Sequence, residues 1–146
     1  MFKSTDFNAL MSLAVSPNEN KFVTTGQDGL IKLWDGKTGG LLKEIKSENL
    51  WVEHAVWSPN GKYFAIGSGN TLLIFNQNGD KTQDFDGHES TVSGIAWHIN
   101  SKTIATSCYG GVRLFEIDQD EPIKFLEWKN SMHSLSWSPD GKFICA

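Results

Sequence analysis

The stretch "GQDGLIKLWDGKTG", residues 26–39, contains most of the information that decides the fold. It combines a tight-turn signal, a short run that alternates apolar and polar residues, a Trp-Asp pair at 34–35 and a second glycine-rich turn. Runs of this kind, bounded by Gly, Asp and Asn, are typical of β-strands. If the pattern recurs at a fixed interval, it marks one unit of a repeat and not an isolated reactive site.

Two markers do recur along the chain with nearly the same spacing. The first marker is a short apolar run that leads to an aromatic residue. This residue is Trp34, Phe75 and then Phe115, at intervals of 41 and 40 residues. A Pro-containing turn and its equivalent recur at intervals of 42, 40 and 40 residues, as "VSP" at 15–17, "WSP" at 57–59, "WHI" at 97–99 and "WSP" at 137–139. Two independent markers with one period indicate an internal repeat.

Each repeat unit contains short strand-like runs separated by turn residues, and no segment shows a convincing helical period. The sequence therefore predicts an all-β fold with units at about 8–47, 48–87, 88–127 and an incomplete 128–146. The expected strands are 10–15, 22–25, 30–34 and 41–45; then 52–57, 63–67, 71–75 and 81–85; then 92–97, 103–107, 111–115 and 122–128; and finally 132–137 and 142–146.

Four strands in each unit of about 40 residues, with Gly87-His88 and Trp34-Asp35, resemble the WD40-repeat β-propeller family. The resemblance covers about residues 8–146, is specific for the fold, and is closest to stand-alone bacterial WD-repeat proteins. It implies that each unit forms one four-stranded antiparallel blade, with the sequence repeat crossing blade borders. It also implies that three blades and part of a fourth belong to a larger, seven-bladed propeller.

The resemblance further implies a hydrogen-bonded relay of His, Ser or Thr, Asp and Trp inside a unit. The first unit supplies Thr24, Asp28 and Trp34, and the third supplies His88 and Thr106, so no unit completes the relay. Because a buried indole N–H needs an acceptor, we expect Trp34 to donate to Thr24, with Asp28 steering the hydroxyl. We interpret these residues as structural, since Asp28 has no second carboxylate with which to divide acid and base roles.

A second set of tryptophans holds one repeated position at the end of the first strand of its unit. These residues are Trp57, Trp97 and Trp137. A large ring at the same place in each unit favours a core between blades over a ligand cage.

The residues that break the repeat are the candidates for binding. Trp51 precedes the first strand of the second unit, Tyr109 lies in a turn between strands, and Trp128 stands where the third unit has His88. The resemblance places these connections on one rim, with Glu48, Asn49 and Asn70 nearby. Two interpretations stay open: a partner-binding surface of aromatic anchors among polar neighbours, or rings that pack under loops of their own chain.

Composition and charge narrow the function classes. The net charge of −4 and the absence of a basic stripe disfavour nucleic acid, and no apolar run approaches the length that crosses a membrane. The four histidines are scattered through the repeat, and Cys108 and Cys145 show no zinc spacing, so no metal or cofactor is expected. Without a secretory or transit signal at the N-terminus, we expect a cytoplasmic protein.

The sequence thus predicts a non-catalytic scaffold that presents propeller loops to protein or peptide partners. One alternative is an enzyme-associated propeller subunit. Another is RNA or ribosome association, which would need a local basic patch built from Lys43, Lys46, Lys81 or Lys129. Because an open stack of blades exposes apolar faces, we expect either a fragment of a longer propeller or copies that associate through their terminal blades.

Overall fold

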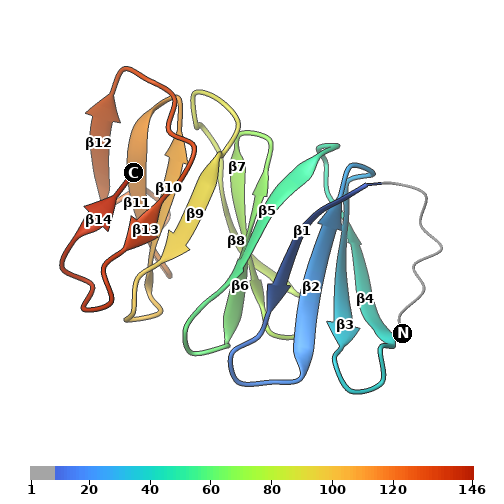
Figure 1. Ribbon diagram of the computed structural model, residues 1–146. Coiled ribbons are helices and arrows are strands. Elements are labelled where there is room, and N and C mark those ends of the chain that lie inside the picture. The colour runs from blue at the N-terminus through green and yellow to red at the C-terminus, as the bar shows by residue number, and fades with distance from the viewer. Residues whose placement is uncertain (1–8) are drawn as a thin grey trace.

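The computed structural model describes residues 9–146, and these residues form four antiparallel β-sheets and no helix (Figure 1). Among them there is accordingly no helix that could cross a membrane. The all-β expectation is confirmed. Three of the sheets have four strands in sequential order, and the fourth has two.

The sheets follow one another along the chain as blades. The first blade contains β1 (Leu10–Val15), β2 (Lys21–Gly26), β3 (Leu30–Asp35) and β4 (Leu41–Lys46). The second contains β5 (Val52–Trp57), β6 (Tyr63–Ser68), β7 (Thr71–Asn76) and β8 (Lys81–Phe85). The third contains β9 (Gly94–Trp97), β10 (Thr103–Cys108), β11 (Gly110–Glu116) and β12 (Lys124–Trp128). The two-stranded sheet pairs β13 (Ser136–Trp137) with β14 (Ile144–Cys145).

Strand bounds in the first two blades agree closely with the expected ones, but several later strands are shorter. β9 begins at Gly94 instead of residue 92, because the Val92 amide donates to the carbonyl of Gly69 in the second blade. β12 begins at Lys124 instead of 122, where Pro122 has no N–H to donate. β13 and β14 cover only parts of the expected 132–137 and 142–146.

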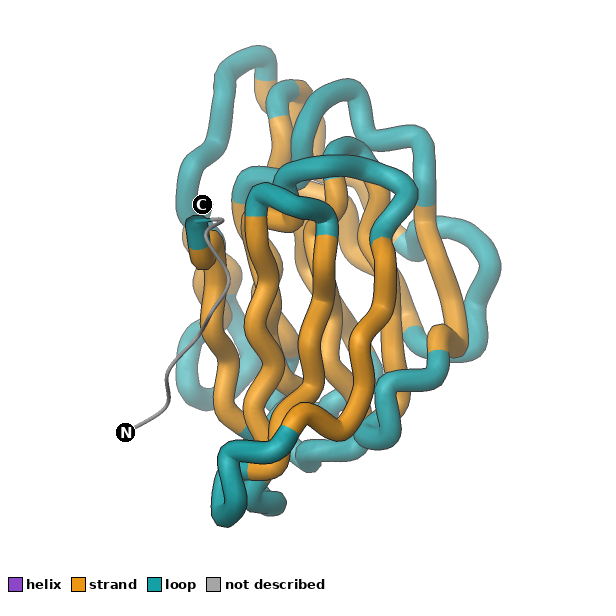
Figure 2. Tube along the Cα trace, turned by 90° about the vertical axis from the view of Figure 1, so that its right-hand side faces the viewer, coloured by secondary structure: helices purple, strands orange, loops and turns teal. Residues whose placement is uncertain are grey.

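The blades stack with their first strands side by side. β1 lies beside β5, β5 beside β9, and β9 beside β13, while β4, β8 and β12 form the outer edges (Figure 1). Figure 2 shows the sheets one behind another. One apolar core fills the space between the first and second blades, and another fills the space between the second and third.

The three tryptophans at the ends of first strands lie at the blade interfaces, as the repeat predicts. Each indole Nε1–H donates to a main-chain carbonyl of the preceding blade: Trp57 to Ala14 at 3.1 Å, Trp97 to Val56 at 3.1 Å and Trp137 to Ala96 at 3.2 Å. Trp57 and Trp97 are buried as well, so the interfaces between the first three blades combine apolar packing with one repeated hydrogen bond.

The connections between strands gather at the two ends of the blades. The end that carries connections 27–29, 47–51, 69–70, 86–93, 109 and 129–135 is called the upper rim (Figure 1). The Pro-containing turns and their equivalent lie at the opposite end, the lower rim. The upper rim therefore carries Trp51 and Tyr109, and Trp128 lies beside it at the end of β12.

Candidate partner-binding surface

The three candidate anchor residues of the upper rim are about half exposed. Trp51, Tyr109 and Trp128 keep 53%, 51% and 58% of their surface accessible. Rings that packed fully beneath neighbouring loops would be buried. Each of these side chains therefore presents apolar surface from which a partner could exclude water.

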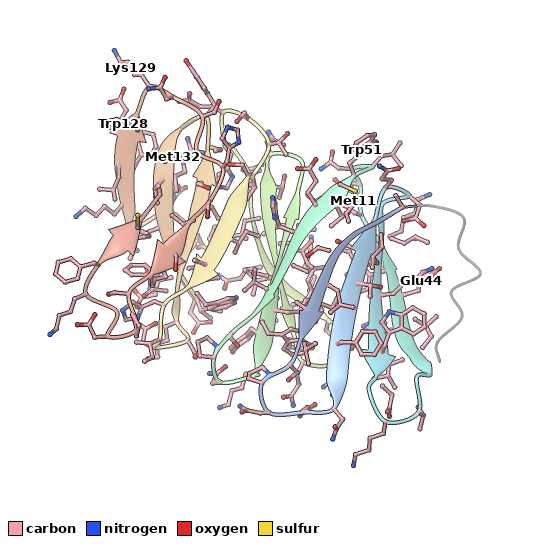
Figure 3. The ribbon with its side chains drawn as sticks, in the orientation of Figure 1. Met11, Glu44, Trp51, Trp128, Lys129 and Met132 are labelled. Carbon is pink, nitrogen blue, oxygen red and sulfur yellow. The ribbon has the colours of Figure 1, made fainter. Side chains whose placement is uncertain are left out.

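The structure divides the candidate residues into two groups on this rim (Figure 3). Trp51 shares the β4–β5 loop with Glu48 and Asn49, and the Asn49 side chain reaches the end of β6, two residues before Asn70. Tyr109 immediately precedes Gly110, which pairs with Trp128 across β11 and β12. Figure 3 places Trp51 and Trp128 on the same rim but well apart, over different blades.

The loop 47–51 is attached to both of the blades that it joins. The Ser47 amide donates to the Gly29 carbonyl of the first blade at 2.8 Å. The Ser47 and Ser68 hydroxyls lie 2.6 Å apart, and the Asn49 side-chain amide donates to the Ser68 carbonyl at 3.1 Å. The Asn49 side chain thus holds the loop in place, a role that its position in the repeat did not reveal.

Trp51 has an unusual backbone conformation. Its φ angle is 68°, in the left-handed region that bulky residues rarely occupy. Such conformations cost of the order of 1–3 kcal/mol and persist where the surroundings impose them. The anchored loop therefore fixes the backbone from which the half-exposed indole projects.

The relay residues of the first unit, Thr24, Asp28 and Trp34, make contacts within the first blade. Trp34 Nε1 donates to the Thr24 hydroxyl at 2.9 Å, as expected, and its ring stacks on Phe22 with centroids 6.0 Å apart. Asp28 accepts a hydrogen bond from the Leu30 amide at 3.0 Å, which closes the turn between β2 and β3. These contacts join the second and third strands of the first blade.

The relay residues of the third unit, His88 and Thr106, join the second and third blades, and the histidine is buried. His88 is 3% exposed, with Nδ1 lying 2.9 Å from the Asn70 carbonyl and Nε2 lying 2.8 Å from the Thr106 hydroxyl. A carbonyl can only accept, so Nδ1 carries the proton and Nε2 accepts from Thr106. Burial lowers the His88 pKa to about 4, and the ring is neutral at pH 7. The turn at Asn70 is thereby fastened to the third blade.

Trp128 and His88 occupy equivalent places in the repeat but have opposite environments. His88 is enclosed between two blades, while Trp128 ends the outer strand β12, all of whose residues are exposed. The structure thus shows a structural role for one member of this pair and an exposed side chain for the other.

The lysines proposed for a basic patch do not form one. Lys43 pairs with Asp80 at 2.6 Å, and Lys81 pairs with Asp84 at 2.5 Å, so acidic partners offset both charges. Lys129 follows β12 of the third blade, whereas Lys46 ends β4 of the first blade. Within residues 9–146, no group of three or more His, Cys, Asp or Glu side chains could hold a metal ion.

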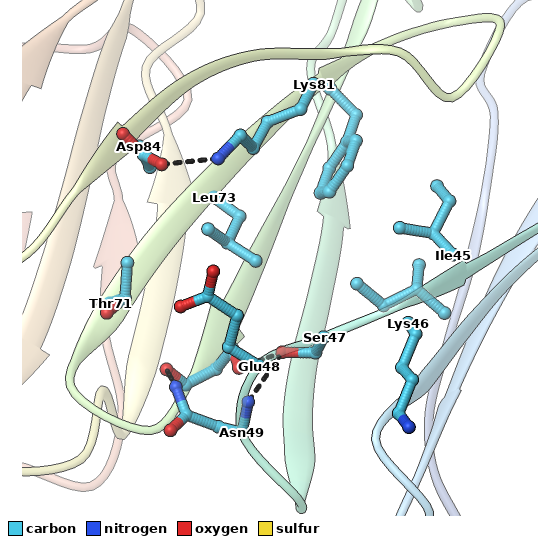
Figure 4. A pocket seen from close by; sticks show the side chains of 12 residues that line it. Ile45, Lys46, Ser47, Glu48, Asn49, Thr71, Leu73, Lys81 and Asp84 are labelled. Atoms are coloured by element: carbon cyan, nitrogen blue, oxygen red, sulfur yellow. Dashed lines mark hydrogen bonds and ion pairs between the residues drawn. The ribbon is translucent and has the colours of Figure 1, made fainter.

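The structure also shows two features that the repeat pattern did not indicate. Leu50, next to Trp51, is 67% exposed and extends the apolar surface of that loop. A groove of about 280 Å³ lies between the first and second blades and includes Glu48 and Asn49 in its wall (Figure 4). The sequence could have indicated Leu50, because it is an apolar residue beside Trp51 in an otherwise polar loop. The groove was not predictable, because it needs side chains from two blades.

Antiparallel four-stranded blades, stacked through their first strands and displaying loops on two rims, define a β-propeller protein. The family model described as "WD domain, G-beta repeat" matches residues 3–35, 39–76 and 79–116, and the chain belongs to the WD40 family. The three matches end where β3, β7 and β11 end, at Asp35, Asn76 and Glu116. The sequence repeat therefore crosses blade borders, as expected.

Known proteins with similar sequences cover much of the chain. It is 38% identical over 96 residues to "Nuclear distribution protein PAC1-1" of Uncinocarpus reesii (strain UAMH 1704), which covers 60% of the chain and 21% of that protein. It is 27% identical over 131 residues to "Intraflagellar transport protein 80 homolog" of Rattus norvegicus, covering 90% and 15%. It is 27% identical over 115 residues to "Ribosome biogenesis protein WDR12 homolog" of Ixodes scapularis, covering 74% and 27%.

A solved structure agrees with the fold. The structure titled "Structure of U3-55K" superposes with a TM-score of 0.84 at 20% identity, covering 91% of this chain and 44% of that one. The chain thus spans less than half the length of these relatives and of this structural neighbour.

Proposed function

We propose that this chain is a non-catalytic scaffold that binds protein or peptide partners through its upper rim. Trp51, Tyr109 and Trp128 act as the anchors. The observation that carries the proposal is the half-exposed state of all three rings at one rim, two of them in connections and Trp128 at the end of β12. Aromatic side chains that a partner can desolvate contribute more than most other residues to binding at protein interfaces.

The rigidity of the rim supports this function. Loop 47–51 is hydrogen-bonded to both adjoining blades, and the Tyr109 amide donates to the Ser90 hydroxyl at 2.9 Å. Loops that are already ordered lose less conformational entropy when a partner binds. WD40-repeat proteins generally mediate protein interactions, and WD40 propellers are mostly non-catalytic scaffolds.

Protein is favoured over RNA as the partner. One similar protein is named for ribosome biogenesis, but RNA binding depends on uncompensated Lys and Arg near phosphates. Here Lys43 and Lys81 have acidic partners, and the whole chain carries a net charge of −4. An enzyme-associated role is compatible with a scaffold, in which case the enzyme would be the partner.

The test is affinity capture from the source cell, followed by binding measurements with the purified captured protein. Trp51→Ala and Trp128→Ala should each weaken binding roughly tenfold or more, as expected for anchor residues. Ile99→Ala is the matched control, because Ile99 is an apolar residue 59% exposed on the lower rim. The proposal fails if the Ile99 variant loses as much affinity as the tryptophan variants, or if neither tryptophan matters.

A further inference from the structure

The groove between the first and second blades combines an apolar floor with charged walls (Figure 4). Ile31 and Ile45 contribute from the first blade, and Leu73 and Phe75 contribute from the second. The wall nearest the upper rim is the loop that carries Glu48 and Asn49. The volume of about 280 Å³ suits one long side chain and not a whole folded element.

The charges that face this inter-blade groove are unequal. Lys81 is bonded to Asp84, and the Asp84 and Glu48 carboxylates together raise the Lys81 pKa. Glu48 itself makes no hydrogen bond or ion pair with the residues that the structure describes. Lys46 also lines the groove, but Figure 4 shows its amine directed away from the Glu48 carboxylate. Two carboxylates thus share a single ammonium group in the groove.

We propose that the inter-blade groove binds an arginine or lysine side chain of a peptide partner. The aliphatic stem lies on Ile45 and Leu73, and the cationic head reaches the Glu48 carboxylate. Long basic side chains routinely cover apolar surface with their methylene groups while keeping the charge at the edge. A guanidinium is the better fit, because it forms paired hydrogen bonds with a carboxylate and is less strongly hydrated than an ammonium.

Charge complementarity selects this occupant over the alternatives. An acidic side chain would be repelled by both carboxylates, and a purely apolar one would leave the Glu48 charge without a partner. A basic side chain satisfies Glu48 and rests on the apolar floor. This inference rests on the proposed function, since it names the kind of partner residue that the rim next to Trp51 would receive.

The test uses two short probes that differ only in charge. Acetyl-Leu-Arg-amide and acetyl-Leu-citrulline-amide are titrated into the methyl-labelled 146-residue chain at low ionic strength and followed by NMR. The arginine probe should give saturable shifts at the Ile31, Ile45 and Leu73 methyl groups. The citrulline probe should bind roughly three- to fivefold more weakly, the range that an exposed ion pair provides.

Two substitutions separate this site from general charge effects. Glu48→Gln should reduce the affinity for the arginine probe to that for the citrulline probe. Glu127→Gln is the control, because Glu127 carries the same charge on the exposed strand β12 and lies outside the groove. Both positions are exposed, so both variants should fold, which circular dichroism verifies.

The outcomes distinguish this inference from the proposed function. Equal binding of both probes, shifts outside the groove, or unchanged affinity of the Glu48 variant would overturn the groove proposal. None of these results depends on the partner captured through Trp51 and Trp128. Conversely, probe binding in a chain whose tryptophan variants capture their partner normally would leave the groove site standing and remove the rim function.

Discussion

At the residue scale, His88 holds a regular position of the repeat, and its protonation would also affect the contact between two blades. In the neutral ring, Nδ1–H donates to the Asn70 carbonyl and Nε2 accepts from the Thr106 hydroxyl. Protonation of Nε2 would reverse its bond with the Thr106 hydroxyl and, at greater cost, would place a charge in a buried site. The contact between the second and third blades therefore depends on pH.

We expect the chain to lose stability as the pH falls from about 6.5 toward 4, in part because of His88. Burial lowers its pKa from 6.5 to about 4, so between these values the unfolded chain binds more protons and acidification favours unfolding. The full effect is about 3 kcal/mol. Urea unfolding at pH 7.5 and 4.5 should show a smaller loss for His88→Asn than for the unchanged chain.

The comparison with the variant is needed because other groups act in the same direction. Burial also lowers the His54 pKa, which costs stability over the same pH range, while hydrogen bonds from Thr38 and Lys37 lower that of Asp35, which costs stability only as the pH approaches 3.8. These groups remain in the variant, so the difference between the two chains isolates His88. An identical loss of stability in both chains would show that the His88 environment has been misjudged.

Residue-scale contacts differed in how far the sequence predicted them. The Trp34–Thr24 bond was predictable, because both residues belong to adjacent strands of one unit and an indole N–H needs an acceptor. The acceptors of Trp57 and Trp97 were not, because they are main-chain carbonyls of another blade and have no side-chain signature. The bond from the Asn49 side chain to the Ser68 carbonyl was missed for another reason, since an asparagine in a loop is typical of a solvated turn.

At the scale of the strand and the blade, the repeat period and the turn residues were enough to predict most of the fold. The strands of the first two blades were predicted within one residue at each end. The late start of β9 was missed because the Val92 amide bonds to Gly69 of a different blade, and such bonds depend on the stacking and not on local propensity. The groove was missed for the same reason.

The blade interface should be more sensitive to mutation than the interior of a blade. Trp97 is 7% exposed, stacks near Tyr63 and bonds to Val56, so Trp97→Ala should cost about 3–5 kcal/mol. Trp34 is only partly buried, and Phe75 already fills its position in the second blade, so Trp34→Phe should cost about 1 kcal/mol for the bond to Thr24.

Denaturant unfolding of the two variants under the same conditions measures this difference. Trp97→Phe is the control for the hydrogen bond alone, because it keeps a large ring at the interface. Its loss should lie between those of the other two variants. Comparable losses for Trp34→Phe and Trp97→Ala would mean that the core does not lie between the blades.

At the scale of the whole molecule, the two ends of the blade stack present apolar side chains to solvent. On β1, Ala14 faces the second blade, so Leu13 and Val15 point the other way, and they are 55% and 64% exposed. At the other end, Leu126 and Phe143 are 37% and 72% exposed. Val15 holds the place of Trp57 in its blade, at which the later units contact a preceding sheet.

We expect this 146-residue chain to associate in solution through these end faces, with a second copy as the neighbouring sheet. Covering apolar surface contributes about 25 cal/mol for each Å² removed from water, and both faces match surfaces that pack together within the stack. Light scattering over a dilution series should show a mass that falls toward the monomer value.

Leu13→Lys combined with Val15→Lys should shift the equilibrium to monomer, because it places two charges on the exposed face of β1. Trp51→Ala, which alters only the upper rim, should leave the association unchanged. A monodisperse monomer at high micromolar concentration, or a Trp51 variant that dissociates as readily as the double lysine variant, would refute association through the end faces.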